Sequence, residues 1–157
     1  MKIIISIFIC LLTIGHNHSY FVKGEDFKGF VFSKDHFVFM SIEDQIKRYT
    51  PSKENIIQLE KLIKINLKEV NTELINQGGD NPIIHKCLKK YLRQYVGFIN
   101  KNGDKIIWVN FIWYNKTDKV KLAKDIINVM DGGSYYWNIK VNLSKSQLFE
   151  LSINGIS

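Results

Sequence analysis

The sequence predicts an α+β fold in which one long N-terminal helix packs on a curved antiparallel meander of about five strands. Three observations support this prediction: an amphipathic stripe at residues 52–77, a hairpin signal within residues 88–114, and strict polar–apolar alternation at residues 135–143. A helix followed by a run of strands usually forms two layers, with the helix on the apolar face of the sheet. At 157 residues the chain is long enough for one domain with a real core.

The helix is expected to run from Ser52 to about Gln77. Thr50 or Ser52 supplies the N-cap, and Gly78-Gly79 is the stop signal. Apolar residues recur three and four positions apart, which predicts a single core-facing surface. The residues of this stripe are Ile56, Leu59, Leu62, Ile63, Leu67, Val70 and Leu74.

The hairpin within residues 88–114 is expected to turn at Asn102-Gly103. This dipeptide favours a two-residue type I′ turn, because both central residues of such a turn need a positive φ. Trp108 would then cover the gap in the sheet left by Gly97. The pairs that follow from this turn are Arg93 with Ile112, Tyr95 with Asn110, and Gly97 with Trp108.

Three further strands are expected at residues 126–131, 135–143 and 147–154, joined by three-residue loops. The middle strand alternates cleanly, so its odd-numbered residues should face the core. The loops place Val129 opposite Trp137 and Phe149 opposite Val141, so that core residues meet core residues. Before the helix, residues 20–42 predict a short hairpin or an extended arm around residues 33–36, with Phe39 among its packing residues.

Residues 1–19 are interpreted as a signal peptide, with cleavage after residue 15 or residue 19, and residues 20–157 as a single α+β domain. Lys2 precedes an apolar stretch that is too short to span a bilayer but suits a signal peptide. Cys10 raises lipidation as an alternative, but Ile9 before it is not a small residue, so cleavage is favoured. The protein is therefore expected to be exported, periplasmic or extracellular, with no stable membrane span after cleavage.

The formal net charge is +7, supplied mostly by dispersed lysines. A solvated surface accounts for this charge, and only Arg48 and Arg93 are arginines, so no nucleic-acid partner is expected. Signal cleavage would leave Cys87 as the one cysteine, which excludes an internal disulfide. Oligomeric state is left open.

A set of motifs runs through residues 88–155. They are YxRQYVGF at 91–98, KxxWVN at 105–110, VMDGG at 129–133, NxKVNL at 138–143 and SxNG at 152–155. Together they resemble a family of small exported proteins common in Bacteroidetes bacteria. That family has no established activity, so the resemblance implies export from a bacterial cell and transfers no catalytic residue. By architecture alone, the expected helix and curved sheet are also similar to cystatin-like and NTF2-like folds.

The sheet face opposite the core gathers amides, cations and aromatic rings, and it is the predicted ligand-binding surface. Such groups bind a glycan or a peptide by hydrogen bonding and ring stacking. An ordinary solvated sheet face is the alternative interpretation. The predicted ligand-binding residues are Arg93, Tyr95, Asn110, Tyr136, Asn138, Lys140 and Asn142.

No catalytic residue, metal site or cofactor is expected. Catalysis by His85 and Cys87 would need a further spatial partner and an oxyanion site, and zinc needs more ligands than this pair offers. Asp131 with its two following glycines is interpreted as a turn.

The sequence therefore favours an exported, non-catalytic binding domain for an envelope or extracellular protein or glycan. Two alternatives stay open. One is an immunity or inhibitor protein against a secreted toxin or protease, although the inhibitory QxVxG motif of cystatins is absent. The other is a small hydrolase-like enzyme, which requires Asp131, His85 or Glu150 to line a common helix–sheet pocket.

Overall fold

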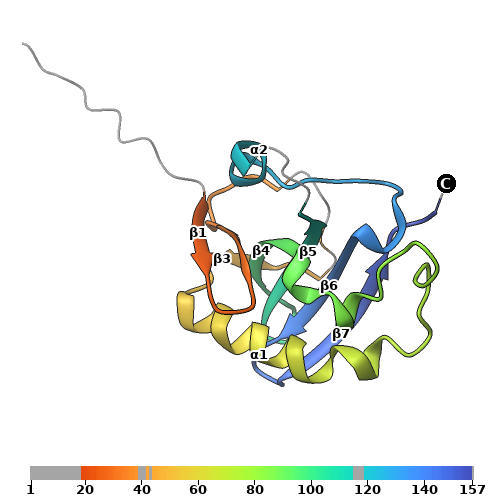
Figure 1. The fold of residues 1–157 in the computed structure, drawn as a ribbon. Coiled ribbons are helices and arrows are strands. Elements are labelled where there is room, and N and C mark those ends of the chain that lie inside the picture. Colours follow the sequence, from red (N-terminus) through yellow and green to blue (C-terminus); the bar gives the residue numbers. More distant parts are fainter. Residues whose placement is uncertain (1–18, 39–41, 43, 115–118, 157) are drawn as a thin grey trace, which may run out of the picture.

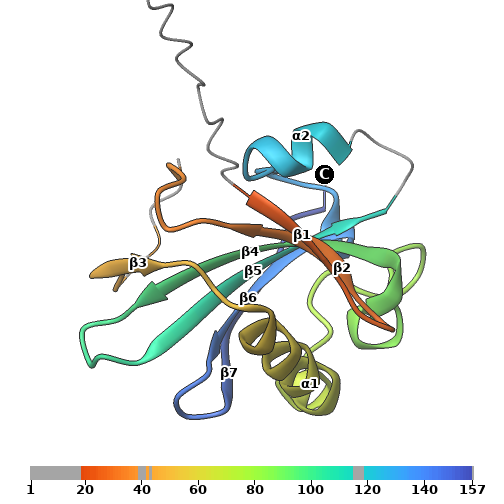
Figure 2. The same cartoon turned by 90° about the vertical axis from the view of Figure 1, so that its left-hand side faces the viewer.

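A mixed β-sheet with helices on both faces forms the centre of the molecule (Figures 1 and 2). The computed structural model describes residues 19–38, 42, 44–114 and 119–156. The predicted signal peptide up to residue 18, and Phe39, lie outside the described residues. The strands are β1 (Ser19–Lys23), β2 (Lys28–Phe32), β3 (Lys47–Tyr49), β4 (Tyr91–Ile99), β5 (Lys105–Trp113), β6 (Tyr136–Asn142) and β7 (Gln147–Ile153). The helices are α1 (Lys53–Val70) and α2 (Lys119–Lys124), with 3-10 turns η1 (Ile84–Lys86), η2 (Leu88–Lys90) and η3 (Gly133–Tyr135).

The strand order is β1-β2-β4-β5-β6-β7, and β3 lies beside β4 as well. Strand β2 pairs in parallel with the first half of β4, whereas β3 pairs antiparallel with its end. The predicted fold was therefore wrong in three respects. The helix follows three strands instead of standing at the amino terminus, the described sheet has seven strands instead of five, and it is mixed instead of an antiparallel meander.

The physical reason lies in residues 19–32, whose place in the sheet was left open by the sequence. They form the β1–β2 hairpin, which turns at residues 24–27 and not at 33–36. Val22 and Val31 enter the core below the sheet, while Phe30 and Phe32 are buried on the other side. Burial on both sides makes this hairpin part of the sheet, and the cystatin-like or NTF2-like plan does not apply.

Helix α1 starts where the sequence predicts and ends earlier. The Ser52 hydroxyl accepts a hydrogen bond from the Asn55 amide (3.3 Å), and the Asn55 side chain accepts one from the Ser52 amide (3.2 Å), which completes a capping box. The helix stops at Val70 because the next residue, Asn71, is buried and exchanges side-chain hydrogen bonds with Gln77. The stop signal is therefore Asn71, and not Gly78-Gly79.

The β4–β5 hairpin is shifted by one residue from the predicted register. Ile99 lies opposite Lys105, so the loop is longer than a type I′ turn. Gly103 alone among the loop residues has a positive φ, of 80°. The Asn100 side chain accepts hydrogen bonds from the backbone amides of Asn102 (3.0 Å) and Asp104 (2.9 Å), which stabilises the longer loop.

Because of this shift, each β4 residue lies opposite a β5 residue that was expected on the other face of the sheet. Arg93 pairs with Phe111, and Asn110 pairs with Gln94 instead of Tyr95. Gly97 pairs with Ile107, so Trp108 does not cover it. A Cβ atom on Gly97 would lie 2.7 Å from the Tyr49 carbonyl oxygen, so glycine is needed there for the close approach of β3.

The carboxyl-terminal half confirms the alternation in β6 but not the first predicted strand. Trp137, Ile139 and Val141 are buried on the α1 side. Residues 126–131 are not a strand, and β6 pairs directly with β5. The β6–β7 register shifts between Asn138 and Lys140, near Glu150 with its φ of 49°, so Leu148 and not Phe149 lies opposite Val141.

Both faces of the sheet are covered, as Figure 2 shows. Helix α1 covers one face, where Leu59 and Ile63 are fully buried against the strands. Helix α2 and the chain that follows it cover part of the other, where Leu122 is buried in the same apolar cluster as Phe98 and Trp108. The open polar sheet face that the sequence predicts is therefore largely enclosed.

Replacing Gly103 tests the loop type. Gly103→Ala should lower the free energy of unfolding by about 1 kcal/mol, because a Cβ atom disfavours positive φ and no atom lies within 4 Å to compensate. Asn102→Ala should change it by less than about 0.5 kcal/mol. Urea denaturation measures both. Equal costs at the two positions would indicate a type I′ turn instead.

Candidate functional site

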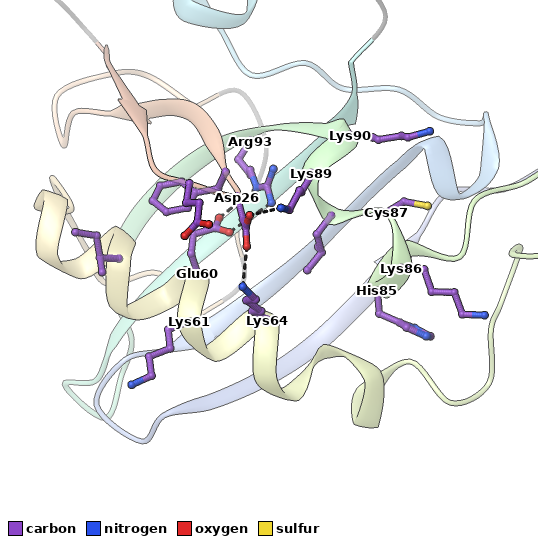
Figure 3. Close-up of a pocket in the computed structure, with 14 residues that line it drawn as sticks. Asp26, Glu60, Lys61, Lys64, His85, Lys86, Cys87, Lys89, Lys90 and Arg93 are labelled. Carbon is purple, nitrogen blue, oxygen red and sulfur yellow. Dashed lines mark hydrogen bonds and ion pairs between the residues drawn. The ribbon is translucent and has the colours of Figure 1, made fainter.

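A pocket of about 570 Å³ opens on the α1 side of the sheet. Its walls are α1, the β1–β2 turn at residues 24–27, and the η1–η2 segment at residues 84–90 (Figure 3). We call it the α1 pocket. Its volume falls in the range of roughly 300–1,000 Å³ that is usual for small-molecule sites.

A buried ion pair forms the floor of the α1 pocket. Arg93 on β4 approaches Glu60 on α1 with its Nε and Nη2 atoms, at 3.3 and 3.4 Å from the two carboxylate oxygens. The Tyr95 hydroxyl donates a hydrogen bond to Glu60 Oε1 at 2.8 Å. The third contact of the guanidinium is the Tyr91 carbonyl oxygen, 2.7 Å from Nη1. Arg93 is only 1% exposed, so its charge is satisfied within the protein.

The position of Glu60 follows from the helix. It lies four residues after Ile56 and three before Ile63, on the buried stripe, and is 8% exposed. Burial raises the pKa of Glu60, while the charge of Arg93 and the hydrogen bond from Tyr95 oppose that rise. Burial also raises the pKa of Tyr95 well above its ordinary value, so its hydroxyl stays a donor.

A second charge cluster lies at the mouth of the α1 pocket. Asp26, from the β1–β2 turn, is bridged by Lys64 on α1 (2.7 Å to Oδ2) and Lys89 on η2 (2.6 Å to Oδ1). Figure 3 shows the three side chains pointing toward one another. Hydrogen bonds from Lys64 and Lys89 lower the pKa of Asp26 to about 2. The carboxylate therefore ties the turn to both walls of the pocket.

The remaining lining combines apolar side chains with further cations. Phe27, Ile57 and Leu88 supply apolar surface. Of these, Ile57 on α1 is 51% exposed to solvent. Five lysines and Arg93 line the pocket against the carboxylates of Glu25, Asp26 and Glu60. The pocket thus carries a net positive charge, which favours an anionic ligand.

His85 and Cys87 also line the α1 pocket. The Nδ1 atom of His85 is 3.0 Å from the amide nitrogen of Asn71. Burial and the nearby charges of Lys86 and Lys68 lower the pKa of His85, which favours its neutral form. Glu150 lines a second pocket beyond the end of α1, and Asp131 is exposed and lines neither. The three residues required by the hydrolase alternative are therefore not brought together.

The seven predicted ligand-binding residues are divided between the two faces of the sheet. Arg93 and Tyr95 lie beneath α1, and of these two Arg93 lines the α1 pocket. The other five lie on the opposite face, because β5 is shifted by one residue relative to β4. They are Asn110, Tyr136, Asn138, Lys140 and Asn142.

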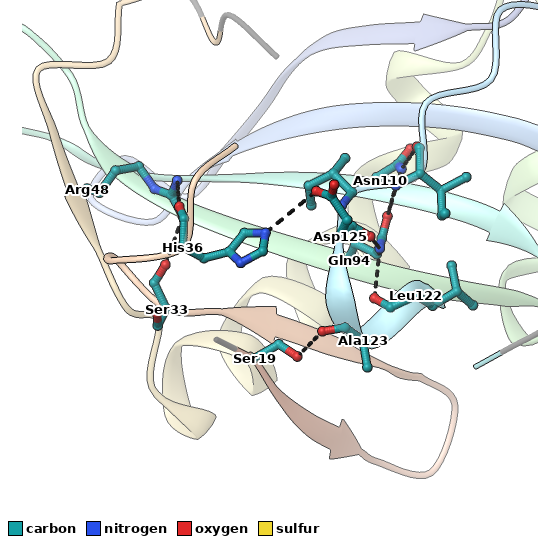
Figure 4. Close-up of polar contacts among 11 residues, drawn as sticks. Ser19, Ser33, His36, Arg48, Gln94, Asn110, Leu122, Ala123 and Asp125 are labelled. Atoms are coloured by element: carbon teal, nitrogen blue, oxygen red, sulfur yellow. Dashed lines mark hydrogen bonds and ion pairs between the residues drawn. The ribbon is translucent and has the colours of Figure 1, made fainter. Parts of the chain in front are cut away.

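Asn110 forms part of an amide pair that holds the chain after α2 onto the sheet (Figure 4). Its amide donates to the carbonyl of Ile127 (2.8 Å) and to Gln94 (3.1 Å). Gln94 donates in turn to the carbonyls of Leu122 (2.9 Å) and Asp125 (2.7 Å). The two amides thus satisfy backbone groups that would otherwise be buried without partners.

The four residues on β6 are also engaged within the protein. Asn138 accepts a hydrogen bond from the Trp108 indole nitrogen at 3.1 Å. Lys140 forms an ion pair with Glu150, and Asn142 donates to Asp104 at 2.9 Å. Tyr136 packs against the apolar cluster on this face. These contacts give the residues structural roles, and their part in ligand binding stays a prediction.

The residues that build the α1 pocket were mostly missed at the level of sequence. A signal for Glu60 was present, since a carboxylate on an otherwise apolar helical stripe indicates a buried partner. Asp26, Lys64 and Lys89 had no such signal, because each is an ordinary charged residue in a polar stretch. Within the part of the chain that the structure describes, no group of three or more His, Cys, Asp or Glu side chains is placed to hold a metal ion. Among the same residues, no helix has the length and hydropathy needed to cross a membrane.

Removing either member of the buried pair should be costly, and removing both should cost less than the sum. Glu60→Met or Arg93→Met leaves a buried charge without its partner and should lower the free energy of unfolding by about 3 kcal/mol. The double variant should fall short of the sum of the two losses by at least about 1 kcal/mol. Urea denaturation of the four proteins measures this, and strictly additive losses would contradict the pairing.

Asp26 should make stability depend on pH in the acid range. Its folded pKa, about 2, is below the value of about 3.9 expected in the unfolded chain. The stabilisation is therefore complete above about pH 5 and is lost as the pH falls toward 2. The melting temperature of the wild type should exceed that of Asp26→Asn at pH 6, and the difference should shrink by pH 2.5. A difference independent of pH would contradict the ion pairs.

Comparison with known proteins assigns no relative. No protein-family model, no curated protein and no solved structure matches the chain. The resemblance to small exported Bacteroidetes proteins accordingly stays a prediction.

Proposed function

We propose that the protein is an exported, non-catalytic binding domain that holds its ligand in the α1 pocket. One observation carries this proposal: a pocket of about 570 Å³, lined by the exposed Ile57 and the half-buried Phe27 and Leu88, includes a buried Arg93–Glu60 pair in its floor. Apolar walls with a few well-placed polar groups are characteristic of binding sites. The sheet face that the sequence predicts as the binding surface is less suited, because the polar side chains on it already have partners within the protein.

The arrangement of titratable groups favours binding over catalysis. Asp26 is held ionised by two lysines, Glu60 is paired with Arg93, and His85 contacts Asn71. A general acid or base must exchange its proton with a substrate, and groups paired in this way are poor candidates. The proposal of export rests on Lys2 and the apolar stretch after it. Cleavage after residue 15 would leave β1 whole, whereas cleavage after residue 19 would remove its first residue.

Blocking the α1 pocket tests the proposal. Ile57→Glu places a carboxylate at the pocket wall, where it interrupts the apolar surface and repels an anionic ligand, at a position that is already 51% exposed, so the fold should tolerate it. Ile65→Glu is the matched control, since Ile65 is 61% exposed on the same helix and does not line the pocket. The full chain is expressed with its own amino terminus, recovered from the cell envelope and culture fluid, and analysed by native mass spectrometry for bound molecules and partners.

The wild type and Ile65→Glu should retain the same ligand, and Ile57→Glu should lose it. A ligand retained equally by all three proteins would place binding elsewhere. Recovery of the wild type without any bound molecule or partner, or recovery only from the cytoplasm, would contradict the proposal.

A further inference from the structure

We propose that the ligand of the α1 pocket is a carboxylate with an apolar tail, and that Asp26 occupies the place of the ligand carboxylate when the pocket is empty. This inference rests on the proposed function, because it requires the α1 pocket to bind a ligand. It adds the chemical class of that ligand and a means by which the protein regulates access to the site.

The contacts of Asp26 show which groups bind a carboxylate at the mouth of the α1 pocket. Each carboxylate oxygen has its own ammonium group, Lys64 at 2.7 Å and Lys89 at 2.6 Å. The two lysines come from different walls of the pocket, and their side chains are 68% and 71% exposed. Any carboxylate entering from solvent can therefore reach both ammonium groups and form the same charge-assisted hydrogen bonds. The two ammonium groups thus match the two oxygens of a carboxylate, one to each.

The deeper cation is not available for this role. Arg93 already makes two contacts with Glu60 and one with the Tyr91 carbonyl, and it is 1% exposed. A ligand that used Arg93 would have to break a buried ion pair, which costs several kcal/mol. The lysine pair at the mouth of the pocket is therefore the place for the ligand charge.

The α1 pocket that holds the lysine pair also has an apolar part in its lining. Ile57 on α1 and Leu88 on η2 line opposite walls, and Phe27 contributes its ring from the turn. Ile57 is 51% exposed, so an apolar tail lying against it would remove hydrophobic surface from water. A charged head with an apolar tail matches both halves of the lining, whereas a fully polar anion would leave the apolar half unused.

Asp26 lies on a segment that can leave the site. The β1–β2 turn links the edge strand β1 to β2, and its closing hydrogen bond runs from the Gly24 amide to the Phe27 carbonyl (2.9 Å). Edge turns with few backbone contacts open locally at lower cost than the core. The carboxylate of Asp26 thus competes with the ligand for the same two lysines, and the measured affinity is reduced by the fraction of molecules in which the site is free.

Isothermal titration calorimetry with dodecanoate tests the competition. Asp26→Asn removes the internal carboxylate with almost no change in volume, and should bind dodecanoate about tenfold more tightly than the wild type. Asp44→Asn is the control, because Asp44 forms an exposed ion pair with Lys101 (3.4 Å) outside the pocket. It changes the net charge equally and should leave dodecanoate affinity unchanged.

A second pair of variants tests the lysines without relying on Asp26. Lys64→Gln/Lys89→Gln should weaken dodecanoate binding at least tenfold. Lys101→Gln/Lys145→Gln removes two lysines that pair with Asp44 and Asp104 outside the pocket, and should have little effect. Dodecanol, which has the tail without the charge, should not bind more tightly to Asp26→Asn than to the wild type. Circular dichroism confirms that each variant is folded.

Three results would overturn the inference: no dodecanoate binding to the wild type or to Asp26→Asn, equal affinity in these two proteins, or tighter binding of inorganic phosphate than of dodecanoate to Asp26→Asn. Each of these would leave the proposed function standing if a different ligand is retained by the wild type and lost from Ile57→Glu. If the Ile57 variant retained the ligand as the wild type does, both the inference and the proposed function would be contradicted.

Discussion

The buried pair between Glu60 and Arg93 is the constraint on which the α1 side of the molecule depends. It joins the middle of α1 to the first half of β4, and the Tyr95 hydroxyl donates a further hydrogen bond to the carboxylate. A buried charge pair is often less stabilising than apolar side chains of similar volume, because both charged groups lose their hydration. Its geometry nevertheless sets how α1 crosses the sheet, and hence the shape of the pocket that stands above it.

On the opposite face of the sheet, two neutral side-chain amides hold the covering segment in place, as the ion pair holds α1. Gln94 and Asn110 occupy neighbouring strands and bind the backbone of the chain from residue 122 to residue 127. Neutral amides hold an irregular segment well, since each offers both donors and an acceptor to exposed backbone groups. The sheet is consequently enclosed by a helix on one side and by an irregular cover on the other, and the concave site lies at the edge of α1.

Charge has two separate uses in the α1 pocket. Deep charges are paired and closed to solvent, and they support the fold. Charges at the mouth are exposed, and the turn that carries Asp26 is held across the pocket through the lysines that would receive an anion. A surface ion pair contributes little to stability on its own. The ion pairs of Asp26 with Lys64 and Lys89 instead couple the position of the β1–β2 turn to the occupancy of the pocket.

Local patterns by themselves determined the start and buried face of α1 and the alternation of β6, because both depend on residues within one element. Ser52 caps the helix, and Ile56, Leu59 and Ile63 are buried as their spacing predicts. The tertiary structure decided the register of β4 against β5, since the Asn100 side chain stabilises a longer loop than Asn102-Gly103 suggests. It also decided the place of the β1–β2 hairpin and the meeting of Asp26 with Lys64 and Lys89. These charges lie far apart in the chain, and only the packing of the hairpin, helix and sheet brings them together.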